Sequence, residues 1–120
     1  MSFLTPGKKN LITDVKGLYI GNSENELINT GSTILTCEDR FVASYKVLGG
    51  APGTRETDLL EPDKLVEKID ALVLSGGSAF GLEAASETVN LLRRDNKGYS
   101  VSNTKVPIVP SAIIFDLMNG

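Results

Sequence analysis

Histidine is absent from the 120 residues of this chain, and cysteine occurs once, as Cys37. The lack of histidine excludes a histidine-based catalytic triad, a histidine zinc site and a histidine pH switch. A lone cysteine cannot form an internal disulfide or a cysteine-rich metal site. Any catalysis by the chain must therefore use serine, threonine, lysine, carboxylate or backbone groups, and we expect no cofactor and no metal.

An excess of positive charge is also missing, because 12 basic residues stand against 15 acidic ones and the net charge is −3 at pH 7. Nucleic-acid binding needs a basic surface, so we expect no nucleic-acid partner. No apolar run has the length of a membrane span, and residues 1–10 contain no apolar signal segment. We therefore expect no membrane partner and a cytoplasmic location.

The hydrophobic pattern predicts one mixed α/β domain at residues 11–120, behind a flexible lead-in at residues 1–10. Pro62 favours the start of a first helix. A second helix is expected from Ser78, with Gly98 well placed to end it. Its apolar face is predicted to contain Leu82, Ala85, Val89 and Leu92. Strands are expected at 18–20, 30–36, 41–48 and 71–74, and a further buried strand at 113–117.

The strongest local motif is SGGSAFGL at residues 75–82, where a glycine pair lies between a predicted strand and a predicted helix. Such a turn lets backbone approach a ligand closely, and N–H groups of the helix beyond it can bind a carboxylate or an oxyanion. The alternative is an ordinary turn in which Ser78 caps the helix. The glycine spacing does not fit a dinucleotide fingerprint, and no Lys-Ser or Lys-Thr follows to make a phosphate loop.

A second motif is the glycine-dense loop GGAPGTRETDLL at residues 49–60. Loops of this kind often carry function, because a rigid scaffold holds polar groups at its edge. Arg55 can clamp a carboxylate in a bidentate pair, and Glu56 or Asp58 can hold an amine. The alternative is that Arg55 and its acidic neighbours pair with one another at the surface.

Asp116 lies inside a third, apolar segment at residues 106–117. A buried carboxylate must be paired or hydrogen-bonded. We expect Asp116 to be structural rather than catalytic, either capping a turn or receiving an arginine.

These motifs together resemble the L-aminopeptidase/D-esterase family, which includes β-peptidyl aminopeptidases and nylon-oligomer hydrolases. The similar segments are, in order, GAPGTRETDLL at 50–60, LSGGSAFGL at 74–82, VPIVP at 106–110 and FDL at 115–117. The similarity runs from residue 10 to residue 120. It implies part of a four-layer α/β/β/α sandwich of the type shared with ornithine acetyltransferase. Because the chain stops after an apolar segment without a closing helix, we expect that sandwich to be incomplete here.

The resemblance also implies a chemistry that needs no histidine. Members of this family are made as precursors that cleave themselves ahead of a serine or threonine, giving an α chain and a β chain. That residue then serves as the nucleophile, and its free amine can act as the base. No serine or threonine of this chain matches the nucleophile position, so we expect no catalytic residue within it. Three places differ from the family pattern. Asn22 stands where a histidine often follows the opening glycine, and Phe115 where some relatives have tyrosine. After the glycine pair, the helix has Ala85, Ser86 and Glu87 where Ala-Asp-Gly is common.

The resulting hypothesis is the N-terminal, α-chain portion of a self-cleaving aminopeptidase or amidase whose nucleophile comes from a downstream segment. The expected partners are that downstream or β-chain segment, a small peptide or amide substrate, and further copies of the chain in a homo-oligomer. One alternative is a truncated, inactive remnant with a structural or oligomerising role, and another is an independent small-molecule binding module. The positions expected to form the substrate pocket are Arg55, Glu56, Thr57, Asp58, Ser75, Gly76, Gly77 and Ser78.

Overall fold

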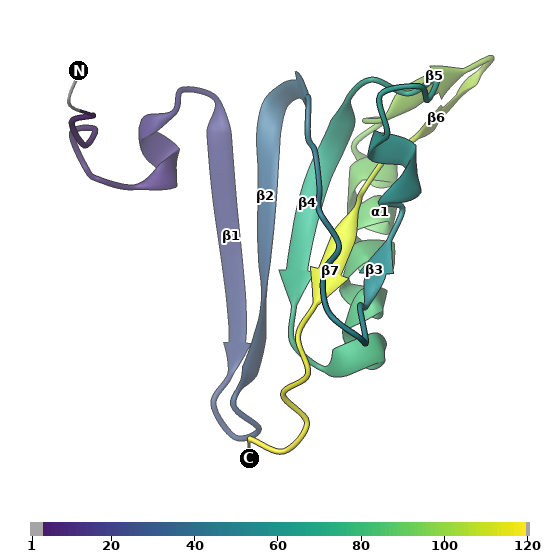
Figure 1. Ribbon diagram of the computed structural model, residues 1–120. Helices are drawn as coiled ribbons and strands as arrows, with labels where there is room; N and C mark the ends of the chain where they lie inside the picture. The colour runs from purple at the N-terminus through teal and green to yellow at the C-terminus, as the bar shows by residue number, and fades with distance from the viewer. Residues whose placement is uncertain (1–3, 120) are drawn as a thin grey trace.

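The computed structural model describes residues 4–119 as a five-stranded mixed sheet with one α-helix, accompanied by a small two-stranded hairpin (Figure 1). The order of strands in the main sheet is β1-β2-β4-β7-β3. The prediction of an α/β fold is confirmed at this level. The strands are β1 (Leu18–Asn25), β2 (Thr30–Phe41), β3 (Thr54–Arg55), β4 (Ile69–Ser75), β5 (Tyr99–Val101), β6 (Thr104–Val106) and β7 (Ser111–Ile113); the α-helix is α1 (Glu83–Arg94), and the 3-10 helices are η1 (Ile12–Asp14), η2 (Asp58–Leu60) and η3 (Ser78–Leu82).

The first two strands form a long antiparallel hairpin with an unbroken register from Leu18 opposite Cys37 to Asn25 opposite Thr30. β-branched residues favour extended backbone, and β2 contains four of them: Thr30, Thr33, Ile34 and Thr36. At the tip, Asn29 adopts a left-handed φ of 47°, a conformation that asparagine tolerates better than most residues. Both predicted strands in this region are confirmed, and both are longer than expected.

The centre of the sheet is formed by β4 and β7, which run parallel with Val73 opposite Ser111 and Ser75 opposite Ile113. Parallel strands need a crossover connection, and here η3, α1 and the β5–β6 hairpin supply it. On their outer sides, β4 pairs antiparallel with β2, and β7 pairs antiparallel with β3. The predicted strand at 71–74 is thus confirmed as the middle of β4.

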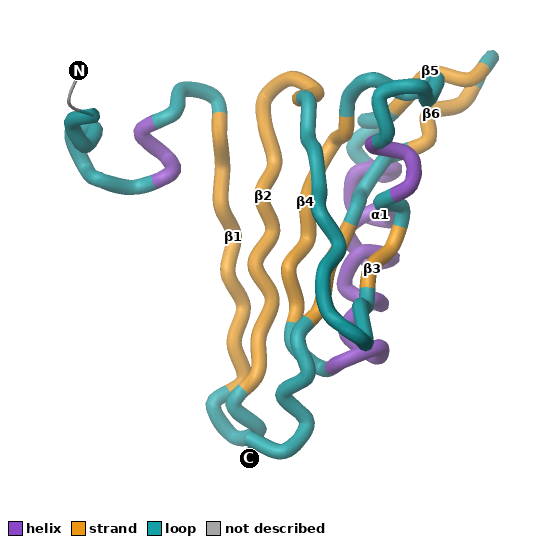
Figure 2. Tube along the Cα trace, viewed as in Figure 1, coloured by secondary structure: helices purple, strands orange, loops and turns teal. Residues whose placement is uncertain are grey.

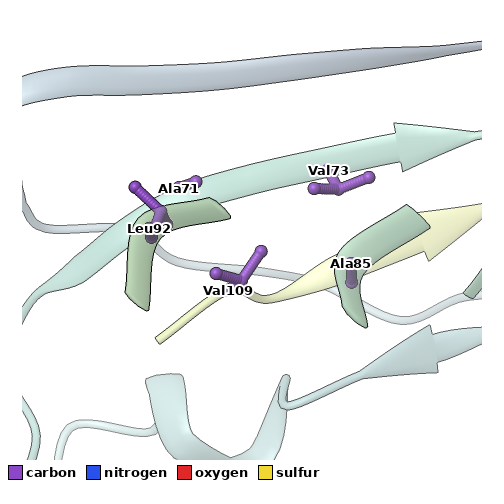
Figure 3. Close-up of a cluster of buried hydrophobic side chains, with 5 residues drawn as sticks. All are labelled: Ala71, Val73, Ala85, Leu92 and Val109. Atoms are coloured by element: carbon purple, nitrogen blue, oxygen red, sulfur yellow. The ribbon is translucent and has the colours of Figure 1, made fainter. Parts of the chain in front are cut away.

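The core lies between α1 and one face of the sheet (Figure 3). Ala71 and Val73 of β4 meet Ala85 and Leu92 of α1, with Val109 filling the space between them. Burying side chains of valine or leucine size contributes roughly 1.5–3 kcal/mol each. The predicted apolar face of the helix is confirmed at Ala85 and Leu92, which are buried, and at Val89, which packs against the cluster. On the opposite face of the sheet, Leu74 is 49% exposed.

The predicted strand at 41–48 is wrong beyond Phe41. Figure 2 shows residues 42–48 as an irregular segment that leaves the end of β2, and Val42 is 74% exposed. Alternating apolar residues form a strand only where a neighbour offers hydrogen bonds. The β4 ladder ends with Ile69 opposite Phe41, so β4 offers no further partner to the residues after Phe41.

The helix predicted from Pro62 is also wrong, because residues 61–68 form turns and irregular backbone. Its expected apolar stripe was short, and Ile69, one member of it, lies in β4 instead. Leu65, another member, is 84% exposed.

The predicted strand at 113–117 is confirmed only at Ile113. The ladder between β4 and β7 ends where Ser75 stands opposite Ile113, because β4 is followed there by the glycine-pair turn. Ile114 and Phe115 come after this point and are 66% and 67% exposed.

The longest helix among residues 4–119 is α1, with 12 residues, and none of the helices described there has the length and apolar character needed to cross a bilayer. Part of the expected lead-in, residues 1–3, lies outside the described residues. Residues 8–9 form a turn in which the backbone N–H of Lys9 donates to the carboxylate of Asp14 at 2.9 Å.

Candidate functional site

The carboxyl ends of the two parallel strands meet at one end of the sheet, beside the tip of the β1–β2 hairpin (Figure 1). In open α/β sheets this is the end where ligands usually bind. A hollow of about 610 Å³ lies there, between the hairpin and the segment that follows β7. Its lining includes Asn22, Thr30, Gly76, Ile114 and Asp116. A second hollow of about 280 Å³ adjoins it, lined by Thr33, Leu74, Ser75 and Ala112 among others.

The glycine pair after β4 is required by its surroundings. A Cβ on Gly76 would collide with the Asp116 carboxylate and the Thr30 hydroxyl. Gly77 has a φ of 86° and Ser78 a φ of 53°, so two successive residues adopt the left-handed conformation. A Cβ on Gly81 would collide with the carbonyl of Gly76. This turn is therefore tightly packed, and most larger side chains cannot enter it.

The backbone N–H groups at this turn are used within the protein. Gly76 donates to the carbonyl of Gly31 at 2.8 Å, and Ser78 donates to the carbonyl of Ile114 at 3.0 Å. Gly77 donates to Oδ1 of Asp116 at 2.6 Å. The N–H groups of Gly76, Gly77 and Ser78, in the turn predicted to bind a carboxylate or an oxyanion, therefore already have acceptors within the protein. The alternative in which Ser78 caps the helix is wrong, because the capping position is Gly77 and no side chain caps η3.

Asp116 joins three segments of the chain at this end of the sheet. It is 6% exposed, and besides the Gly77 bond its Oδ2 accepts a hydrogen bond of 2.6 Å from the hydroxyl of Thr30. The Thr30 hydrogen bond and then the Gly77 N–H lower the pKa of Asp116, since both stabilise the charged form. The expectation that Asp116 is buried and hydrogen-bonded at a turn is confirmed, and its partners are Thr30 and Gly77 where an arginine was the other possibility.

Ser75 is also held by a side chain from the neighbouring strand. Its Oγ lies 2.7 Å from Oγ of Ser32, directly across the β2–β4 ladder. Neither lysine nor arginine lines the 610 Å³ hollow, whereas Glu24, Glu26 and Asp116 do. Such a lining offers carbonyl and carboxylate acceptors to a cation, and one of these carboxylates, Asp116, already accepts the hydroxyl of Thr30.

Arg55 points to the other side of the sheet, toward α1. Its guanidinium donates to Oγ of Ser86 at 2.6 Å. The alternative in which Arg55 pairs with its acidic neighbours is contradicted, because the ion pairs found within residues 4–119 join Arg40 to Asp70 and Lys64 to Asp63.

The remaining residues of the 55–58 segment are engaged locally. Oε2 of Glu56, a residue with a φ of 54°, accepts a hydrogen bond of 3.3 Å from the backbone of Val109. The hydroxyl of Thr57 lies 3.2 Å from that of Thr54, and Asp58 begins η2. This segment is therefore folded onto its neighbours.

The two predicted pocket segments lie on opposite sides of β7. The carbonyl of Gly53 accepts from Ile113 at 3.0 Å, and the carbonyl of Ser75 accepts from Ile114 at 3.0 Å. The structure thus brings the segments close to each other but not into one hollow. Ser75 and Gly76 line the hollows at the end of the sheet, and Gly77 lines a smaller neighbouring one, whereas residues 55–58 line none of these three.

Sequence reasoning missed Thr30, Ser32 and Asp116 as parts of this site. Thr30 and Ser32 are ordinary strand residues by pattern, and their role appears only when β2 is placed beside β4. The signal that was available is Asp116 itself, a carboxylate in an apolar run that has to find a donor. Within residues 4–119 no group of three histidine, cysteine, aspartate or glutamate side chains is arranged to hold a metal ion.

Comparison with known proteins gives this arrangement its context. The chain is 41% identical over 119 residues to proteins described as uncharacterized aminopeptidases in Mycobacterium bovis and Mycobacterium tuberculosis, and 40% identical to one in Mycobacterium leprae. The alignments cover 92% of this chain and 33–35% of the relatives. The chain therefore spans about a third of the length of the curated relatives it matches.

The family comparison covers the hairpin, the glycine-pair turn and the segment that contains Asp116 in one continuous match. Residues 10–120 fit the sequence profile of peptidase family S58. Because this match covers nearly the whole chain, the chain belongs to peptidase family S58, the L-aminopeptidase/D-esterase family.

Proposed function

We propose that this chain is the N-terminal, α-chain portion of a self-cleaving aminopeptidase or amidase. The observation that carries the proposal is the match of residues 10–120 to a peptidase family, combined with a coverage of 35% of the aminopeptidase relatives. The nucleophilic serine or threonine would then be supplied by a downstream segment, which is cut from the precursor so that this residue becomes N-terminal. The substrate would be a small peptide or a similar amide with a free amine.

The lining of the 610 Å³ hollow supports a substrate of this kind. A free N-terminus is a cation at neutral pH, and carboxylates such as Glu24 and Asp116 stabilise a cation nearby. The hydroxyl of Thr30 donates to Asp116, the hydroxyls of Ser32 and Ser75 bond to each other, and no lysine lines either hollow that these residues border. In this proposal these hydroxyls shape the pocket, and the attacking hydroxyl comes from the downstream segment.

The sheet face opposite α1 supports the further proposal of a layered sandwich. Leu72 and Leu74 of β4 and Ala112 of β7 lie half-buried or exposed there. Apolar side chains on a sheet face are stabilised when a second layer covers them. A second sheet contributed by the downstream segment would cover this face and complete the α/β/β/α arrangement.

Reconstitution tests the proposal. The chain is coexpressed with the segment encoded after the codon of Gly120, and amino-acid p-nitroanilides are assayed for release of p-nitroaniline. We expect turnover, together with a new N-terminal serine or threonine found by sequencing the smaller fragment. The matched control replaces that residue with alanine, which should abolish both cleavage and turnover.

Two results would count against the proposal. The first is the absence of cleavage and turnover in a reconstituted complex that is folded by circular dichroism. The second is a stop codon directly after Gly120 in the gene, which would favour the inactive remnant.

A further inference from the structure

The outer edge of β1 is a free strand edge of the main sheet. β1 is the first strand in the sheet order, and among residues 4–119 it pairs only with β2. The N–H of Glu38 bonds to the carbonyl of Gly17, and in an antiparallel ladder alternate residues turn their backbone groups toward the partner. The backbone groups of Ile20, Asn22 and Glu24 therefore point away from β2. Consistent with this, the carbonyl of Gly31, which lies opposite Glu24, accepts the N–H of Gly76, the residue directly after β4.

This edge lacks the features that usually prevent strand pairing. Proteins protect free edges with proline, lysine, bulges or very short strands. β1 has eight residues, LYIGNSEN, with an unbroken register and with neither proline nor lysine. At its middle, Gly21 carries no side chain on either face of the sheet, and a Cβ there would meet nothing within 4 Å. None of these protective devices therefore prevents another strand from pairing with β1.

The two ends of β1 carry opposite charge. Before β1 lies an arm, residues 4–17, which extends beyond the start of the strand on the side of its free edge (Figure 1). The arm contains exposed Lys8, Lys9 and Lys16 against one acidic residue, Asp14. The hairpin tip, residues 24–29, comprises the last two residues of β1 and the turn to β2, and contains exposed Glu24 and Glu26 and no basic residue.

Exposed apolar side chains accompany the charges at both ends. In the arm, Leu11, Ile12 and Val15 are 61%, 54% and 58% exposed. In the hairpin tip, Leu27 and Ile28 are 87% and 52% exposed. The arm is not loose at this point, because the Asp14 carboxylate accepts the backbone N–H groups of Lys9 and Leu11 and fixes the turn. A folded arm that presents apolar side chains outward is suited to cover a complementary surface.

We propose that the β1 edge docks a second copy of this chain, with the two β1 strands antiparallel about a two-fold axis. Such an axis places the start of β1 in each copy beside the end of β1 in the other. The basic arm of one copy then meets the acidic hairpin tip of the other, twice per dimer. A register centred on Gly21 pairs Ile20 with Asn22 of the second copy and directs Lys16 toward Glu26 of the second copy. The two sheets join into one of ten strands.

Sedimentation velocity of the 120-residue chain over a concentration series tests the proposal, with amide hydrogen exchange followed residue by residue. We expect a reversible dimer in which the N–H groups of Ile20, Asn22 and Glu24 become protected as the dimer fills. Glu24→Pro removes one outward donor without touching the bonds to β2 and should abolish the dimer. Protection of the core amides of Ala71 and Val73 shows whether each variant is still folded.

A charge exchange provides the second, independent test. Lys16→Glu or Glu26→Lys alone should weaken association about tenfold. Each substitution replaces an attraction between opposite charges with a repulsion between like charges, and the two-fold axis makes this happen twice in the dimer. The double variant, Lys16→Glu with Glu26→Lys, should restore association, since the attraction returns with its sign exchanged. The matched control is Glu67→Lys with Lys105→Glu, at two exposed positions outside β1, the arm and the hairpin tip, and it should leave the dimer unchanged.

Three outcomes would overturn the proposal. The chain could remain a monomer throughout the concentration series. It could form a dimer that Glu24→Pro and the charge variants leave intact, which would place the contact on another surface such as the sheet face opposite α1. The β1 amides could also be protected in a monomer, which would mean that a segment of the same polypeptide covers the edge.

Discussion

The hydroxyl of Thr30 donates a 2.6 Å hydrogen bond to the carboxylate of Asp116, although 86 positions separate the two residues in the sequence. This bond ties the start of β2 to the segment after β7. The same carboxylate accepts the N–H of Gly77, so that the glycine-pair turn is held from both sides. The end of the sheet proposed to bind substrate is thus built around one buried acid.

Acid should weaken the contribution of Asp116 to stability. Its pKa is lowered in the folded chain, chiefly by Thr30 and then by Gly77, so the folded state binds a proton less readily than the unfolded state. Its contribution is therefore complete above the unfolded pKa of about 3.9 and is lost as the pH falls through the lower folded pKa. We expect Asp116→Asn to lower the melting temperature at neutral pH, with the difference from wild type narrowing in acid. Thermal circular dichroism over a pH series measures this, with Asp63→Asn at the surface as control; a difference that stays constant with pH would contradict the prediction.

Gly76→Ala should destabilise the fold by about 1–3 kcal/mol, the usual cost of forcing a methyl group into packed surroundings. Its new Cβ would collide with the Asp116 carboxylate and the Thr30 hydroxyl, and it would break the contact between them. Gly50→Ala is the matched control, because a Cβ at Gly50 meets nothing within 4 Å. Urea unfolding compares the two variants. Equal free energies of unfolding would show that the turn is less tightly packed than described.

Leu92→Ala should cost about 2–5 kcal/mol, because it leaves a cavity between α1 and the sheet. Leu92 is 9% exposed and belongs to the cluster with Ala71 and Val109. The control is Leu65→Ala, at a position 84% exposed, which should change the free energy of unfolding by less than about 0.5 kcal/mol. Chemical denaturation followed by circular dichroism distinguishes the two, and comparable losses would contradict the placement of the core.

Arg55→Ala should affect stability more than substrate binding. Its guanidinium donates to Ser86 of α1 at 2.6 Å, on the far side of the sheet from the hollow near Ser75. A hydrogen bond with a charged donor contributes about 1.5–3 kcal/mol, less where water reaches it. In the reconstituted enzyme we expect KM to change by less than about twofold, since a group that does not touch substrate adds no binding energy. A large rise in KM at unchanged stability would instead support the original prediction that Arg55 binds substrate. A double-mutant cycle with Ser86→Ala separates the pair from its surroundings.

The helix α1 and the central strand β4 were predictable because the spacing of their apolar residues in the sequence matches the faces that are buried in the structure. Ala85 and Leu92 repeat at helical spacing and face the core, and Ala71 to Leu74 form a compact apolar run inside β4. Residues 42–48 show why pattern alone is insufficient: the alternation is present, but no neighbouring strand is available to pair with them.

The site was harder to predict than the fold. The glycine-pair turn was located correctly, and its tight packing follows from residues that no local spacing could indicate. Thr30 and Asp116 meet only after β2, β4 and β7 have been assembled side by side. The direction of Arg55 toward α1 likewise depends on the register of β3 against β7, in which Arg55 stands opposite Ser111.

The place of β7 in the sheet constrains the order in which the chain can fold. Within the described part of the chain β3 pairs only with β7, yet it precedes β7 by more than fifty positions in the sequence. The β1–β2 hairpin can close early through local contacts, whereas β3 has no neighbour until residues 111–113 have crossed over α1 and joined β4. During synthesis the loop around residues 50–60 therefore cannot pair until β7 has emerged from the ribosome.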